Sequence, residues 1–160
     1  MGNCEEQAER ISVAARARQL TIATAESLTG GRISAVLGAA PSSSEWYRGS
    51  IVAYASSVKH GLLQVPGGPV VSEPSARAMA TTVAELLDAD LAVAVTGVGG
   101  PEPQDGQPPG TVWFGIFAGG DTRTELRHFP GEPREVVEET TAHALCLLDA
   151  ALRRQTQALR

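Results

Sequence analysis

Two side chains in this sequence could together perform nucleophilic catalysis, a serine on a glycine-rich turn and a lysine. Lys59 is the only lysine among 160 residues, and the other twelve basic side chains are arginines. A buried ammonium can lose its proton and act as a base, whereas a guanidinium stays charged in proteins. Chemistry that needs a neutral amine must therefore use Lys59. Ser27 would then be the nucleophile, and Tyr54 could relay a proton or stabilise developing charge.

A second serine competes for the same lysine. Ser56 and Lys59 have the S-x-x-K spacing of penicillin-recognising enzymes, which places both side chains on one helix face. The companion K-T-G cannot occur in a chain with one lysine, and no S-D-N is present. We therefore favour Ser27, while Ser56 could simply cap the helix that contains Lys59. The alternative without chemistry is a surface lysine and an ordinary turn serine.

Ser27 lies in the segment 24–31, between an expected strand and an expected helix. Such a corner exposes a side chain at the carboxyl end of the strand, and the helix start offers unpaired backbone N–H groups. The amides around Thr29, Gly30 and Gly31 could therefore hold an oxyanion or a phosphate. A plain turn with two glycines for tight packing is the alternative.

The segment 97–110 is a long loop with four prolines and five glycines. Its G-x-G start resembles part of a dinucleotide-binding motif, but the prolines prevent the helix that should follow. A substrate-binding loop fits better, because ordinary connections are shorter. Thr96, Gly97 and Gly99 are therefore candidate binding residues. Arg134, at the start of the last helix, could clamp a phosphate or form a surface ion pair with a neighbouring glutamate.

Hydrophobic periodicity and turn residues predict five strands and five helices. We expect strands at 21–25, 50–54, 91–95, 111–118 and 122–129. We expect helices at 5–18, 30–39, 56–63, 72–88 and 132–153. Strands separated by helices, with one hairpin at 119–121, predict one three-layer α/β/α domain over 1–160, with its core at about 5–154. Its sheet should be mixed and roughly five-stranded.

Composition excludes several classes of function. The net charge of −5 and the few aromatic residues do not favour nucleic acid as a partner. No apolar run suits a membrane span and no signal peptide is evident, so we expect a cytoplasmic protein. Cys4 and Cys146, the latter on the apolar stripe of the last helix, are expected to be inert thiols. The histidines have no metal-binding spacing, so no metal or cofactor is expected. Symmetric homo-oligomers are common at this size.

Several of these segments together resemble the CinA carboxy-terminal domain family, the nicotinamide mononucleotide deamidases. The matching pieces occur in family order over about residues 5 to 152. They are A-E-S-L-T-G-G at 25–31, W-Y-R-G at 46–49, V-A-Y at 52–54, Lys59, V-S-E-P at 71–74, T-G-V-G-G-P at 96–101, P-G-T-V-W at 109–113 and the turn at 131–134.

The resemblance implies hydrolysis of nicotinamide mononucleotide to nicotinate mononucleotide and ammonia. It implies Ser27 as nucleophile, Lys59 as base and Tyr54 as an assisting residue, and it adds Glu26 to the substrate-binding residues. It also implies the stand-alone form of the family, without the amino-terminal domain that many CinA proteins carry, and a three-layer fold with a mixed five-stranded sheet.

The chain departs from the family pattern at three places that leave the catalytic trio intact. Ala55 to Val58 replace the usual S-N-E-A, Gln107 replaces a lysine, and Pro103-Gln104 replace a Gly-Gly pair. These changes bear on substrate affinity and identity. A non-catalytic nucleotide-sensing or competence-associated binding domain, or an amidase for another small amide, are the alternative functions.

Overall fold

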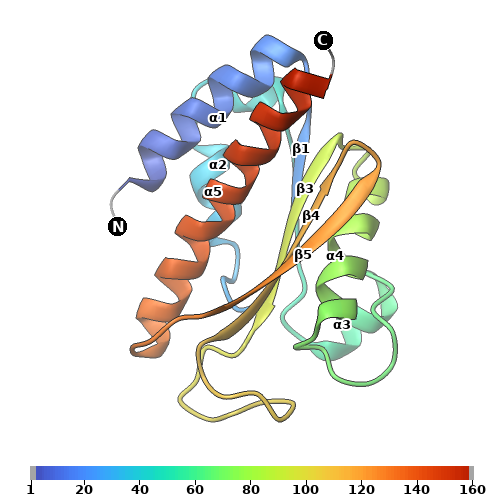
Figure 1. The fold of residues 1–160 in the computed structure, drawn as a ribbon, viewed down its shortest axis with the longest axis vertical. Helices are drawn as coiled ribbons and strands as arrows, with labels where there is room; N and C mark the ends of the chain where they lie inside the picture. The colour runs from blue at the N-terminus through green and yellow to red at the C-terminus, as the bar shows by residue number, and fades with distance from the viewer. Residues whose placement is uncertain (1–2, 159–160) are drawn as a thin grey trace.

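The chain forms one five-stranded mixed sheet, seen in a computed structural model that describes residues 3–158, with side chains described for 3–155 (Figure 1). The strand order across the sheet is β2 (Tyr47–Val52), β1 (Ile22–Glu26), β3 (Leu91–Gly97), β4 (Thr111–Ala118) and β5 (Asp121–His128). The first three strands run parallel, and the β4–β5 hairpin continues the sheet with antiparallel pairing. The expected mixed sheet is confirmed.

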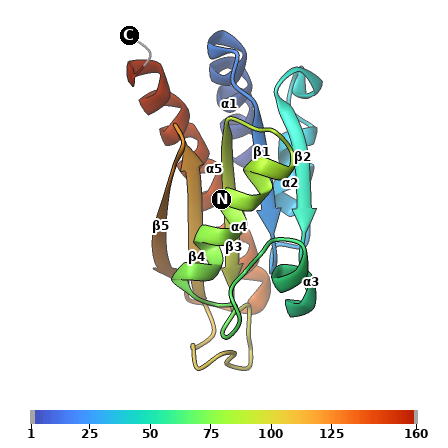
Figure 2. The same cartoon turned by 90° about the vertical axis from the view of Figure 1, so that its right-hand side faces the viewer.

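Helices cover both faces of this sheet. One face carries α1 (Cys4–Arg18), α2 (Arg32–Gly38) and α5 (Pro133–Ala158), and the other carries α3 (Ser56–Gly61) and α4 (Glu73–Leu86) (Figures 1 and 2). A short 3₁₀ turn, η1 (Ser43–Glu45), leads into β2. Ser72 caps α4, since its Oγ accepts a hydrogen bond of 3.3 Å from the N–H of Ser75. The three-layer α/β/α prediction is confirmed.

The central strand β3 separates two apolar cores. All seven of its residues are buried, as expected for a strand covered on both faces. Leu91, Val93 and Val95 pack in the core with α1, α2 and α5. Ala92 and Ala94 pack on the opposite side, against α4. Large side chains thus fill one face, and small ones let α4 approach the other.

Gly115 on β4 shows how close that approach is. A Cβ at this position would lie 2.3 Å from the carbonyl oxygen of Ala76 on α4. No side chain fits there, so the glycine is required by packing rather than by its backbone angles. Close packing of α4 against β4 and β3 fixes the segment before α4, where the N–H groups of Val70 and Val71 donate to Asp105 of the long loop.

Several predicted boundaries were wrong by a few residues. The second strand runs from Tyr47 to Val52 rather than over 50–54, so Tyr54 lies beyond its end. The third strand continues through Gly97, two residues past the expected end. The last helix extends to Ala158, beyond the expected 153. The predicted domain, 1–160, includes residues 1–2 and 159–160, which lie outside the described part.

Two further observations concern the surface. Cys146 is exposed, so its placement on the apolar stripe of the last helix was wrong, and Cys4 is half-buried. Both thiols are free, and burial raises the pKa of the Cys4 thiol. Within residues 3–158, no helix combines the length and the apolar character that crossing a membrane requires.

Candidate functional site

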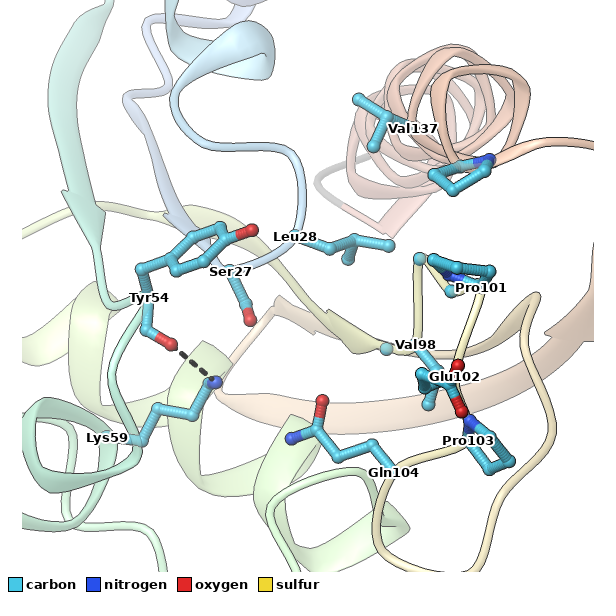
Figure 3. Close-up of a pocket in the computed structure, with 14 residues that line it drawn as sticks. Ser27, Leu28, Tyr54, Lys59, Val98, Pro101, Glu102, Pro103, Gln104 and Val137 are labelled. Atoms are coloured by element: carbon cyan, nitrogen blue, oxygen red, sulfur yellow. Dashed lines mark hydrogen bonds between the residues drawn. The ribbon is translucent and has the colours of Figure 1, made fainter.

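A cavity of about 390 Å³ lies at the carboxyl ends of the three parallel strands. Its position follows from topology, since the residues after parallel strands gather at one edge of the sheet. Its volume suits a small molecule. It is lined by Ser27, Leu28, Tyr54, Lys59, Pro133, Val137 and residues 97–104 (Figure 3). The predicted catalytic trio and the long loop therefore meet in one cavity.

Ser27 is the first residue after β1 and is only 5% exposed. The turn closes when the N–H of Gly30 donates to the Ser27 carbonyl oxygen at 3.0 Å. In the described part of the chain, no acceptor binds the backbone N–H groups of Leu28 and Thr29. The Ser27 Oγ likewise has no hydrogen bond there and points into the cavity (Figure 3). A hydroxyl without a hydrogen-bond partner, next to two backbone amides without acceptors, is the arrangement expected of a nucleophile beside an oxyanion-binding site.

Glu26 does not line the cavity where a substrate contact was expected, and it caps the start of α2. Its fully buried carboxylate accepts hydrogen bonds at the start of α2. The donors are Thr29 Oγ1 at 2.7 Å and the N–H groups of Gly31 at 3.0 Å, Ile33 at 3.1 Å and Ser34 at 2.7 Å. An anionic cap of this kind satisfies helix-end donors and suits the helix dipole.

This cap uses groups of four residues that were predicted to bind a ligand, and it leaves one of their backbone amides available. Glu26 occupies the helix N-terminus where an external anion was expected, and the N–H of Gly31 and the hydroxyl of Thr29 donate to it. The N–H of Gly30 is used within the turn. Gly30 and Gly31 are needed for their left-handed backbone, with φ of 58° and 102°. Only the backbone N–H of Thr29 stays available, next to that of Leu28.

Lys59 reaches the cavity from α3 and is only 3% exposed. Burial lowers the pKa of its ammonium, and the negative charge of Asp105 opposes that change. Its Nζ donates a hydrogen bond of 3.5 Å to the main-chain carbonyl of Tyr54. Figure 3 shows the Lys59 amine and the Ser27 hydroxyl directed toward the same space. No hydrogen bond joins these two atoms among the described residues.

Tyr54 lines the cavity but is 71% exposed. Its contact with Lys59 is made by the main chain, and its phenol lies on the Leu28 side of the cavity (Figure 3). The rival serine, Ser56, is exposed and does not line the cavity. It does not cap α3 either, because Ala55 occupies the N-cap and makes no side-chain hydrogen bond. The S-x-x-K alternative therefore lacks a shared pocket.

The long loop forms the opposite wall of the cavity. Gly97 and Gly99 line it as expected, and the N–H groups of Gly99 and Gly100 have no acceptor among the described residues. These two amides can bind an anion. Thr96 does not line the cavity, because its fully buried hydroxyl donates to the Val70 carbonyl oxygen at 2.7 Å.

Arg134 also does not line the cavity. Its side chain is 89% exposed, and its Nε lies 3.9 Å from Glu138 Oε2 one helical turn away. The apolar neighbours Pro133 and Val137 line the cavity instead, from one face of α5. Their four-residue spacing on an expected helix was the signal that could have found them.

Two polar residues of the loop, Glu102 and Gln104, were also missed by sequence reasoning. Apart from their position in the long loop, the only signal was that Pro103-Gln104 depart from the family's Gly-Gly. In residues 3–155, no group of three His, Cys, Asp or Glu side chains could hold a metal ion. The cavity presents the Ser27 hydroxyl, the buried Lys59 amine, the polar side chains of Tyr54, Glu102 and Gln104, and free backbone amides.

The fold and this cavity define an α/β domain with a serine–lysine site at the carboxyl ends of its parallel strands. A family model described as the CinA C-terminal domain matches residues 4–152. The chain therefore belongs to the CinA C-terminal domain family, which confirms the resemblance seen in the sequence.

Individual relatives agree with this assignment. A protein from Geobacillus kaustophilus, named as competence-damage inducible, is 40% identical over 134 residues, which cover 81% of this chain and 32% of the relative. The chain thus spans about a third of that relative's length. Protein YdeJ of Escherichia coli K12 is 38% identical over 138 residues, covering 82% of this chain and 80% of YdeJ. A crystal structure of a CinA superfamily protein from Klebsiella pneumoniae matches with a TM-score of 0.90 and 34% identity, covering 95% of this chain and 99% of that chain.

Proposed function

We propose that this protein is an amidohydrolase that converts nicotinamide mononucleotide to nicotinate mononucleotide and ammonia. One observation carries the proposal: a buried lysine with a lowered pKa shares a cavity with a serine hydroxyl that has no partner in the described chain. A serine becomes nucleophilic when a base lies within reach, and a neutral lysine can supply it. Family membership supports the choice of substrate.

The first half of the reaction forms an acyl-enzyme. Neutral Lys59 takes the proton of Ser27 Oγ, and the oxygen attacks the carboxamide carbon. The N–H groups of Leu28 and Thr29 stabilise the oxyanion, a contribution on the order of 3 kcal/mol per donor. When the C–N bond breaks, the Lys59 ammonium returns its proton to the leaving nitrogen, and ammonia departs.

Water completes the cycle. Lys59 removes a proton from a water molecule, whose oxygen attacks the ester carbon and expels Ser27, and the same proton then returns to the serine oxygen. Tyr54 closes one side of the cavity with its ring, and its phenol can orient the substrate. The amides of Gly99 and Gly100 are the candidates for binding the phosphate, in place of Arg134 and Thr96.

Ammonia release from nicotinamide mononucleotide by the purified protein tests this proposal. We expect turnover that stops in a Ser27→Ala variant. Binding of the nucleotide without ammonia release would instead support the sensing domain that we considered from the sequence. Turnover of other small amides, without turnover of nicotinamide mononucleotide, would support the same amidase chemistry on a different substrate.

A further inference from the structure

Gln104 stands on the loop wall of the cavity, and its backbone is held in place. Its N–H donates to the carbonyl oxygen of Gln107 at 3.1 Å, and its carbonyl accepts from the N–H of Gln107 at 2.8 Å. The next residue, Asp105, accepts hydrogen bonds from the N–H groups of Val70 and Val71. The backbone that carries the Gln104 side chain is therefore held in place by hydrogen bonds, although the loop is exposed.

The side chain of Gln104 is directed across the cavity. Figure 3 shows its carboxamide pointing toward the space that Ser27 and Lys59 face. No group in the described chain donates to this carboxamide or accepts from it. A glutamine side chain offers both an acceptor oxygen and N–H donors. A primary carboxamide offers the complementary set of groups.

We propose that Gln104 binds the carboxamide that Ser27 attacks, with its side-chain oxygen accepting an N–H of the substrate amide. The inference rests on the proposed amidohydrolase function and adds a specificity residue to it. The hydrogen bond holds the leaving nitrogen on the Lys59 side, where that nitrogen must receive a proton. It also selects primary amides over esters of the same acyl group, because an ester has no N–H to donate.

The test compares two substrates that share one acyl group. Nicotinamide mononucleotide releases ammonia, and the methyl ester of nicotinate mononucleotide releases methanol. In Gln104→Met, which keeps the length of the side chain and removes its polar atoms, we expect kcat/KM for the amide to fall about tenfold. The kcat/KM for the ester should change by less than about twofold.

Gln7→Met is the matched control, since it makes the same substitution on α1, at a residue that does not line the cavity. We expect it to leave kcat/KM for both substrates unchanged. Thermal unfolding should show that both variants are folded. An equal loss on amide and ester in Gln104→Met would overturn the proposal, and so would no loss on either. If wild-type protein hydrolysed neither compound, the proposed function itself would fail, and this inference with it.

Discussion

The Asp105 carboxylate accepts a hydrogen bond of 2.9 Å from the backbone N–H of Val70. A second bond of 3.1 Å comes from the N–H of Val71, so one side chain ties the long loop to the segment that precedes α4. The same carboxylate raises the pKa of Lys59 against the effect of burial. Asp105 therefore connects the shape of the loop wall to the protonation of the proposed base.

Asp105→Asn should shift the pH dependence of activity. Without the negative charge, the Lys59 ammonium is less stabilised, so its pKa falls further and neutral amine appears at lower pH. We expect the acidic limb of kcat/KM for ammonia release to move to lower pH. Asp121→Asn, in the hairpin at the other end of the sheet (Figure 1), is the control and should leave the limb in place. An unchanged limb in Asp105→Asn would contradict this role.

Replacing each serine in turn separates the two candidate nucleophiles. Ser27→Ala should abolish ammonia release, because Ser27 is the one of the two serines that lines the cavity. Ser56→Ala should only slow the reaction, since its side chain is exposed outside the cavity. Circular dichroism should show both variants folded. Loss of turnover in Ser56→Ala alone would give the role to the S-x-x-K pair.

Lys59→Arg should be inactive. The substitution keeps a positive charge but removes the basic amine, because a guanidinium does not deprotonate in proteins. In wild-type protein, kcat/KM should rise with pH as Lys59 loses its proton, with a midpoint below the ordinary lysine value of 10.5. A pH–rate profile measures this midpoint. A value at or above 10.5 would exclude Lys59 as the neutral base.

The pH dependence of the free energy of unfolding should reveal the lowered pKa of Lys59 without any measurement of activity. Because the folded-state pKa of Lys59 is lowered, the unfolded chain binds more protons between that pKa and 10.5. The Lys59 contribution to the free energy of unfolding therefore increases with pH through this window and is constant above it. Urea unfolding of wild type and Lys59→Met across the window measures the difference. A difference that does not vary with pH would contradict the lowered pKa.

Glu26→Ala should destabilise the domain without directly removing a substrate contact. It leaves three backbone N–H groups and the Thr29 hydroxyl without their acceptor. We expect a loss of about 3 kcal/mol or more in the free energy of unfolding. Glu45→Ala, at an exposed position, is the control and should change it by less than about 0.5 kcal/mol. Equal effects of the two would show that the cap is not important for stability.

The sequence predicted the fold because its signals were local and strong. Continuous apolar residues marked β3, Ser72 marked the start of α4, and the glycines at 119–120 marked the hairpin. Because parallel strands place their following residues at one edge, Ser27 and Lys59 could also be predicted to share a cavity. Strand ends were less certain, since residues such as Tyr54 continue an apolar pattern after pairing has stopped.

Several predicted site residues lie outside the cavity lining because of contacts that spacing does not reveal. Glu26 was expected to face a ligand, yet its carboxylate accepts hydrogen bonds from the Thr29 hydroxyl and from the start of α2. Thr96 and Arg134 carry suitable chemistry, but one side chain turns to Val70 and the other to solvent. Gln104 was missed because an irregular loop has no periodicity from which the direction of a side chain can be inferred.

The single lysine has a practical consequence. An amine-directed reagent can modify only one side chain in this protein, and that side chain lies inside the cavity. Modification of Lys59 would therefore be slowed by any molecule that fills the cavity, whether or not that molecule is turned over. A slower mass increase at Lys59 would thus report occupancy of the cavity and allow compounds to be screened as ligands before a substrate is known.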